Sequence, residues 1–194
     1  MTTVETPAAG DVIPPGYTVI EVRVGKLRQL FNAIDPSPFR DRDLDPRVEQ
    51  FIVDWSREAP TRAPLALLVR LDHPANPADD AAVVRDSIHG FFANRAAATR
   101  GRLRQLFRVG RVSLAIGLAV LTVFMIAAQF VSRRAGTSGI TEVLHESLSI
   151  GGWVAMWRPL EIFLYDWWPI RAEARRFDRL AVMPVRLSYA TAGG

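Results

Sequence analysis

VSLAIGLAVLTVFMIAAQFV, residues 112–131, is the stretch that decides how this chain can fold. Its twenty residues carry no charge, and Gln129 is the one strongly polar side chain among them. A helix of this length extends about 30 Å, which matches the hydrocarbon thickness of a bilayer. The alternative is a buried helix of a soluble domain, but such helices seldom run this far without a polar face. The sequence therefore predicts a transmembrane helix over residues 112–131.

Arginines crowd the segment that leads into this stretch. The ones nearest to it are Arg100, Arg102, Arg104, Arg108 and Arg111. By the positive-inside rule this side of the membrane is the cytoplasm, and anionic lipid head groups are the expected partners of these side chains. The whole chain has 24 basic and 20 acidic residues, a net charge of +4. Nucleic acid is not an expected partner, because no recognition motif accompanies the charge.

The residues before the arginines predict a small cytoplasmic α/β domain over residues 17–111, after a disordered tail over residues 1–16. Apolar and polar side chains alternate over residues 17–24, as in a half-buried strand. Asp45 and Pro46 are typical of a helix start, and an apolar stripe continues to Glu58. The apolar run over residues 65–71 suits a central strand. This strand–helix–strand order indicates a parallel crossover.

A second apolar segment covers residues 140–170, after a polar turn over residues 132–139 that we expect in the periplasm. Fewer arginines flank the turn than flank the outer ends of the two segments. The positive-inside rule therefore predicts a two-helix transmembrane hairpin in a bacterial inner membrane, with both termini in the cytoplasm. Residues 171–194 are expected to form a cytoplasmic helix and a strand that returns to the domain. Pro184 restricts this strand to an edge or to an irregular start.

The second segment contains the most unusual chemistry of the chain, WRPLEIFLYDWWP over residues 157–169. Arg158 and Glu161 lie three residues apart and are expected to pair on one helix face. Pro159 removes a helical hydrogen-bond donor and marks a kink. An aromatic belt at a membrane interface is predicted from Trp153, Trp157, Tyr165, Trp167 and Trp168. These charges are interpreted first as interfacial anchors and second as part of an ion or substrate pathway.

Motifs for catalysis, cofactors and metals are missing from the sequence. The triplet Asp41-x-Asp43-x-Asp45 opens like a calcium loop, but Pro46 replaces the turn glycine, so capping and turn roles are favoured. The histidines His73, His89 and His145 lack metal-ligand spacing. There is no cysteine, no phosphate-binding glycine loop and no GxSxG. We predict no catalytic, cofactor-binding or metal site, and no cofactor.

Two segments together resemble a group of uncharacterised small bacterial inner-membrane proteins. They are LFNAIDPSPFRDRDLD, residues 30–45, and WRPLEIFLYDWWP, residues 157–169. The resemblance implies two membrane spans and no known activity, and it transfers no catalytic residue to this chain.

The sequence as a whole predicts a non-enzymatic inner-membrane protein that acts as an interaction or accessory subunit, with a protein partner or as a homo-oligomer. One alternative is a subunit of an oligomeric transporter or ion pathway that uses Arg158, Glu161 and Asp166. A second alternative is a membrane-anchored enzyme resembling a hydrolase, because catalytic triads are spatial rather than sequential.

Overall fold

The computed structural model describes residues 8–35, 42–60, 63–72, 77–134 and 139–189. It divides into two compact units. Unit 1 comprises residues 1–97 and 174–194, and unit 2 comprises residues 98–173. Helices make up most of the described chain, and strands form one small sheet. The predicted fold, an α/β domain interrupted by a transmembrane hairpin, is wrong.

Unit 1 contains a four-stranded sheet of order β1-β4-β3-β2. The strands are β1 (Ala8–Gly10), β2 (Thr18–Val24), β3 (Leu65–Leu71) and β4 (Val185–Tyr189). β3 pairs in parallel with both β2 and β4, and β1 is antiparallel to β4. Parallel neighbours need a crossover connection, so helical segments must join them. Helix α1 (Pro46–Glu58) lies in the connection from β2 to β3, and all of unit 2 lies in the connection from β3 to β4.

One face of this sheet forms the core of unit 1. The register places Ile20, Leu67 and Leu187 on this face, and each of them is fully buried. The same core includes Ile52 of α1, together with Val84, Ile88, Phe92, Phe177 and Leu180 from α2 (Pro77–Arg134) and α5 (Trp167–Leu180). The alternate residues of the strands face outward, and Glu21 and Arg23 are exposed. The sheet therefore buries one face under helices and leaves the other open.

Helix α1 begins where its sequence predicts. The Asp45 side chain accepts a hydrogen bond from the backbone N–H of Arg47 at 2.9 Å, and Pro46 occupies the first turn. Such a cap satisfies a donor that the helix itself leaves unpaired. Asp43 donates its backbone N–H to Asp35 at 2.8 Å, while Asp41 lies outside the described residues. Asp45 therefore has the capping role favoured over calcium binding.

The expected disordered tail is wrong for residues 8–10, which form β1; residues 1–7 lie outside the described residues. A Cβ on Gly10, whose φ is +100°, would stand 2.6 Å from the Val185 carbonyl oxygen, so only glycine fits there. Asp11 accepts hydrogen bonds from the Val185 backbone N–H at 3.1 Å and from Arg85 at 3.3 Å. Hydrogen bonds to Asp86 and Asp11 raise the pKa of Arg85 above its ordinary value. These contacts order a segment of small residues that has no hydrophobic periodicity.

Strand β4 is an inner strand, although Pro184 suggested an edge. Pro184 lies just before β4, where its missing N–H is not needed, and its carbonyl accepts a hydrogen bond from Leu67 at 2.8 Å. The His89 ring nitrogen Nε2 donates to the neighbouring Met183 carbonyl at 2.8 Å. Of the two positions expected for Pro184, the structure shows the irregular start of the strand and not the edge of the sheet.

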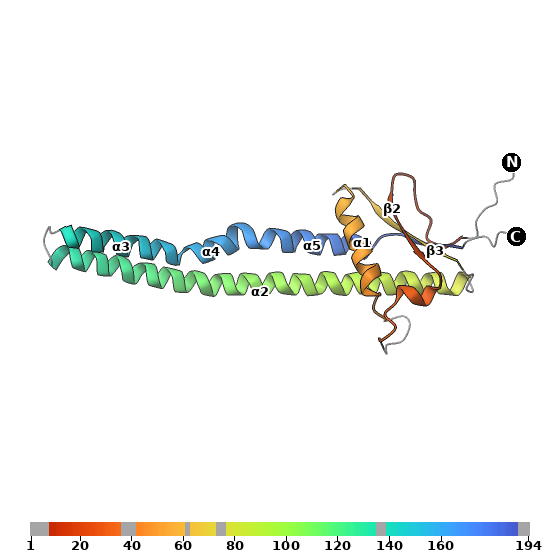
Figure 1. Ribbon diagram of the computed structural model, residues 1–194, viewed down its shortest axis with the longest axis horizontal. Coiled ribbons are helices and arrows are strands. Elements are labelled where there is room, and N and C mark those ends of the chain that lie inside the picture. Colours follow the sequence, from red (N-terminus) through yellow and green to blue (C-terminus); the bar gives the residue numbers. More distant parts are fainter. Residues whose placement is uncertain (1–7, 36–41, 61–62, 73–76, 135–138, 190–194) are drawn as a thin grey trace. The chain divides into compact units, whose positions relative to one another are not determined.

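Unit 2 contains the continuation of α2 and a segmented helical arm beside it (Figure 1). The arm comprises α3 (Gly139–Ala155), α4 (Trp157–Glu161), the π-helix η3 (Ile162–Asp166) and the start of α5. The predicted periplasmic turn falls partly on residues 135–138, outside the described residues. Helix α2 passes through Gly101 without a break. A glycine costs a helix only about 1 kcal/mol, which neighbouring residues offset.

The predicted two-helix transmembrane hairpin is not found. Among the described residues only α2 is long and apolar enough to cross a membrane, by length and composition. The segment over residues 140–170 fails because it is not one helix: α3 has 17 residues, and it ends before the short α4 and η3. Pro159 removes one helical hydrogen bond, and charged side chains lower the apolar character beyond it.

The inner position of β4 leads to a stability prediction. Leu187→Ala should destabilise unit 1 by about 2–5 kcal/mol, because it leaves a cavity in a closely packed core. Thermal unfolding of the full chain in a mild detergent measures this loss. The control is Val182→Ala, since Val182 is 75% exposed and should change stability by less than about 0.5 kcal/mol. Equal effects of the two substitutions would contradict the central place of β4.

Candidate membrane-facing surface

Unit 2 exposes the apolar stretch of α2 almost entirely. Only 11% of the most apolar 18-residue window of this helix is buried. Ile116, Leu118 and Ile126 are 60%, 48% and 62% exposed, and their positions point to more than one side of the helix. A helix that is apolar all round must be covered by lipid or by protein, because water would make such exposure costly. The exposure excludes the alternative of a buried core helix within this chain.

The arginines before this stretch are all exposed, and four of them share one stripe of α2. Helical geometry places Arg100, Arg104, Arg108 and Arg111 within one quarter of the helix circumference. Arg102 points to another side, and its Nη1 lies 3.8 Å from Glu173 Oε2. The stripe therefore presents charge along one line, as a contact with anionic head groups requires.

Glycines let the arm approach α2 closely. A Cβ on Gly110 would stand 2.8 Å from Ile162, and one on Gly117 would stand 2.9 Å from the Ala155 carbonyl oxygen. On the arm, a Cβ on Gly151 would stand 2.8 Å from Phe124, and Gly152 meets Leu121 in the same way. Small residues at helix contacts are typical of packing in membranes, where close approach replaces the hydrophobic effect. These contacts bring the arm and α2 close together within unit 2.

The break in the arm coincides with one of these glycines. The Ala155 carbonyl would accept the N–H of residue 159 in a regular helix, but Pro159 has none. Helix α3 ends at Ala155, and Met156 instead donates to the Trp153 carbonyl at 3.0 Å. The freed Ala155 oxygen lies against Gly117 of α2, where a Cα–H group can approach it. The predicted kink at the proline is therefore part of the helix contact.

Charged side chains gather just beyond the break. Arg158 donates to Glu161 Oε2 at 2.8 Å, and the same Nη1 lies 3.5 Å from Asp166 Oδ2. The π-helix that follows Glu161 changes the phase of the arm, so that Asp166, eight positions after Arg158, can reach the same cation as Glu161. The side chains of Arg158, Glu161 and Asp166 are 61%, 43% and 31% exposed. The predicted pair is thus in contact, and Asp166 joins it.

The aromatic residues of the predicted belt fall into two kinds. Trp153, Trp157, Tyr165 and Trp168 are exposed. Trp167 instead donates its indole N–H to the Phe163 carbonyl at 2.9 Å, and its ring lies 6.5 Å from that of Phe107 and 5.5 Å from the Arg171 guanidinium. Sequence reasoning missed Phe107, although it lies on the arginine-rich segment where an aromatic side chain is out of pattern.

The exposed aromatics do not lie at one level along the arm. Trp153 and Trp168 are fifteen residues apart, so their positions differ by roughly 20 Å along a helix axis. An interfacial layer is only about 5–8 Å thick on each side of the hydrocarbon. Tyr165 and Trp168 therefore fit the arginine-rich interface, whereas Trp153 and Trp157 belong to a separate level.

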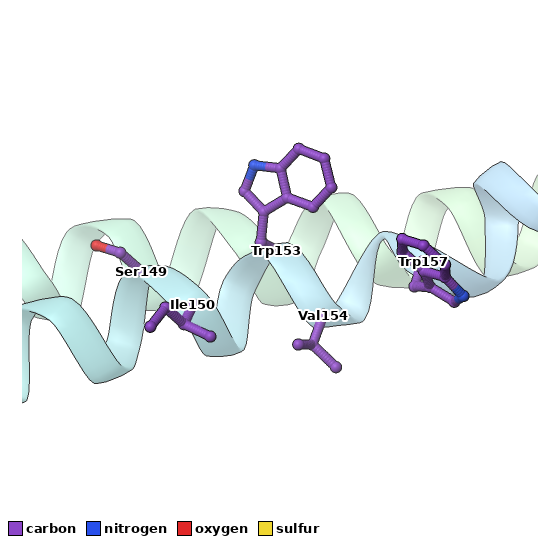
Figure 2. A pocket seen from close by; sticks show the side chains of 5 residues that line it. All are labelled: Ser149, Ile150, Trp153, Val154 and Trp157. Atoms are coloured by element: carbon purple, nitrogen blue, oxygen red, sulfur yellow. The ribbon is translucent and has the colours of Figure 1, made fainter.

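At that separate level the arm carries an open apolar groove of about 570 Å³ (Figure 2). Its lining residues are Ser149, Ile150, Trp153, Val154 and Trp157. Ser149 donates its hydroxyl to the His145 carbonyl at 3.0 Å, so its polar group is satisfied within α3. The groove offers apolar contact area and no free charge, which suits a hydrocarbon chain better than a polar metabolite.

Other candidate sites in the described residues are weak. No group of three or more His, Asp or Glu side chains in these ranges can hold a metal ion, and His73 lies outside them. A polar pocket of about 170 Å³ in unit 1 is lined by Arg42, Asp43, Asp86, Ser87, Gly90, Phe91 and Asn94. Ser87 donates its hydroxyl to the Val83 carbonyl, four residues earlier in the same helix, at 2.8 Å. A nucleophilic serine would instead donate to a neighbouring base.

Comparison of the chain with protein-family models, with curated proteins and with solved structures finds no match.

The glycine contacts predict opposite outcomes for the same substitution at two sites of α2. Gly117→Ala should destabilise unit 2 by about 1–3 kcal/mol, because its methyl group meets backbone of the arm. Gly101→Ala is the control, since nothing lies within 4 Å of its Cβ position. This control should stabilise the helix by about 0.5–1 kcal/mol. Thermal unfolding of both variants in one detergent measures the difference, and stabilisation by Gly117→Ala would contradict the contact with Ala155.

The charged cluster predicts non-additive losses. Removing Arg158 leaves two carboxylates without their cation, so Arg158→Ala should cost more stability than Glu161→Ala. The double substitution should cost less than the sum of the two, by about 0.5 kcal/mol or more. Thermal stability of the singles and the double in one detergent provides the cycle. Strictly additive losses would mean that the two side chains do not interact.

Proposed function

We propose that this protein is a non-enzymatic, membrane-anchored accessory protein of a bacterial inner membrane, which holds the sheet of unit 1 at the cytoplasmic surface for a protein partner. The proposal is carried by one observation: the apolar stretch of α2 is exposed except along the line that packs against the arm. Lipid is the cover that such a surface most simply requires, because about twenty apolar residues match a bilayer in length. The apolar groove and exposed tryptophans of the arm would contact the same lipid.

The pairing of strands in the sheet supports an arrangement in which both ends of the chain lie on one side of the membrane. Strand β4 pairs directly with β3, so residues 18–71 and 185–189 must lie together. The arginine stripe of α2 lies between this domain and the apolar stretch. Positive residues next to a membrane helix favour the cytoplasmic side, so we assign unit 1 to the cytoplasm.

A role in binding another protein fits unit 1 better than catalysis does. Its described residues offer a half-open sheet with charged side chains, and they contain no deep pocket with a nucleophile beside a base. An exposed sheet surface on a membrane-tethered domain is suited to recognition of a partner.

A second candidate is a subunit of an oligomeric ion pathway. The observation in its favour is the cluster of Arg158, Glu161 and Asp166 around a π-helix, a feature that recurs at functional sites. Flux measurements on purified protein in liposomes separate the two proposals. A pathway predicts flux that Glu161→Gln abolishes, and an accessory role predicts no flux from either protein.

Membrane anchoring is tested by fractionation. The full chain should remain in the membrane pellet after alkaline carbonate extraction. Ile116→Asp with Ile126→Asp should shift it toward the soluble or degraded fraction, because each carboxylate costs about 2.5–3.5 kcal/mol near the bilayer centre. The control is Ile34→Asp, at a residue of unit 1 that is 89% exposed. Release of the unsubstituted chain by carbonate would contradict anchoring by α2.

The assignment of sides is tested with reporter fusions. Cytoplasm-active reporters fused to the N-terminus and to the C-terminus should both be active, because the sheet holds both ends in one domain. A periplasm-active reporter at either end should be silent. Opposite results at the two termini would contradict the pairing of β3 with β4 in the cell.

A further inference from the structure

Strand β2 has seven residues and lies at one edge of the sheet. Along its outer side, the backbone N–H and C=O groups pair with no strand among the described residues. Thr18 donates its N–H to the Pro64 carbonyl at 2.8 Å, and the Val24 carbonyl accepts from Asp72 at 3.3 Å, so even-numbered residues face β3. The N–H and C=O groups of Val19, Glu21 and Arg23 therefore point away from the sheet. Within the described ranges no strand pairs with them, since β2 is the last strand of the order.

This edge lacks the usual protections against pairing. It contains no proline and no bulge, and its register with β3 is continuous over all seven residues. The opposite edge of the sheet is different, because β1 has only three residues. Charged side chains on an edge normally repel a second strand, but here the signs alternate, with Glu21 followed at the next outward position by Arg23. Alternating signs can attract a copy of the same strand.

We propose that β2 pairs antiparallel with β2 of a second copy of this chain, about a two-fold axis at Val22. In this register Glu21 lies opposite Arg23 of the second copy, and the axis repeats the pair in the other direction. Both residues point their backbone groups outward, so each opposed pair also exchanges two backbone hydrogen bonds. Two four-stranded sheets become one eight-stranded sheet.

Charge selects this register over its neighbours. A shift of the axis by one residue toward the N-terminus places Glu21 opposite Glu21, and a shift toward the C-terminus places Arg23 opposite Arg23. Like charges directly opposite each other destabilise a sheet, and opposite charges stabilise it. Arg70 already binds Glu21, with its Nε 2.7 Å from Oε1, so the second carboxylate oxygen can accept from Arg23 of the second copy. Within one chain the Arg23 Nε lies 3.8 Å from Glu21 Oε1, a long contact of a side chain that is 71% exposed, and the dimer would replace it with a contact to Glu21 of the second copy.

The dimer rests on the proposed function in one respect, because it identifies the protein partner as a second copy of this chain. The pairing of the strands itself does not depend on membrane anchoring. Anchoring of two copies in one bilayer would raise their local concentration and favour the pairing. The test is therefore made in detergent micelles, where anchoring plays no part. A chain that stays in membranes after carbonate extraction and is monomeric in detergent would overturn the dimer alone.

The first experiment measures the mass of the full chain in a mild detergent by light scattering after size-exclusion chromatography. The unsubstituted chain should be a dimer, and Arg23→Glu should weaken dimerisation by roughly tenfold or more, because two attractive pairs become repulsive. Arg57→Glu, at an exposed arginine of α1, is the matched control and should leave the dimer intact. Mixing Arg23→Glu with Glu21→Arg should restore a dimer, since the two variants are complementary. A monomeric unsubstituted chain, or a dimer indifferent to Arg23→Glu, overturns the proposal.

The second experiment reads the register directly, because the natural chain has no cysteine. Glu21→Cys mixed with Arg23→Cys should form a disulfide-linked dimer under mild oxidation, since opposed residues in this register have Cα atoms about 5.5 Å apart. Either variant alone should cross-link far less, because its cysteines are not opposed. Equal cross-linking of the single variants, or none in the mixture, assigns the dimer to another surface and overturns the register.

Discussion

The pairing of β4 between β1 and β3 is the constraint on which the rest of the structure depends. It joins residues 185–189 to a sheet whose other strands end before residue 72, so the intervening chain is one long crossover. Unit 2, residues 98–173, is an insertion in that crossover, and the chain on either side of it belongs to unit 1. The entropic cost of closing a loop increases only slowly with its length, so the burial of β4 residues can offset the cost of this long connection. The sheet therefore fixes where the chain must return, whatever surrounds unit 2.

Within unit 2, two local defects complement each other. Pro159 frees the carbonyl of Ala155, and Gly117 provides the space in which that oxygen meets α2. Each residue alone would weaken a helix, but together they form a close helix contact. The π-helix that follows brings Asp166 to the cation that already binds Glu161. Under the proposed lipid cover such paired charges would be favoured, because an unpaired carboxylate in an apolar environment costs several kcal/mol.

Local signals in the sequence were sufficient for the elements whose residues carry their own pattern. The alternation of β2, the apolar run of β3, the cap of α1 at Asp45 and the apolar stretch of α2 all occur where expected. Strand β1 was missed because Ala8–Gly10 has no pattern and is ordered by Asp11 and β4. The prediction of a transmembrane hairpin was wrong because the apolar composition of residues 140–170 does not reveal where the helix is interrupted. The contact between Arg158 and Glu161 follows from spacing, whereas Asp166 joins them only through the π-helix.

The central claim is that lipid covers the apolar stretch of α2. Spin labels placed singly at Ile116, Leu118 and Ile126 in protein reconstituted into liposomes measure this cover through collisions with oxygen and with a water-soluble nickel complex. The account predicts high oxygen accessibility and low nickel accessibility at all three positions, because they lie on different sides of a helix immersed in hydrocarbon. Nickel accessibility equal to that of a label at Ile34, which is 89% exposed in unit 1, would contradict it.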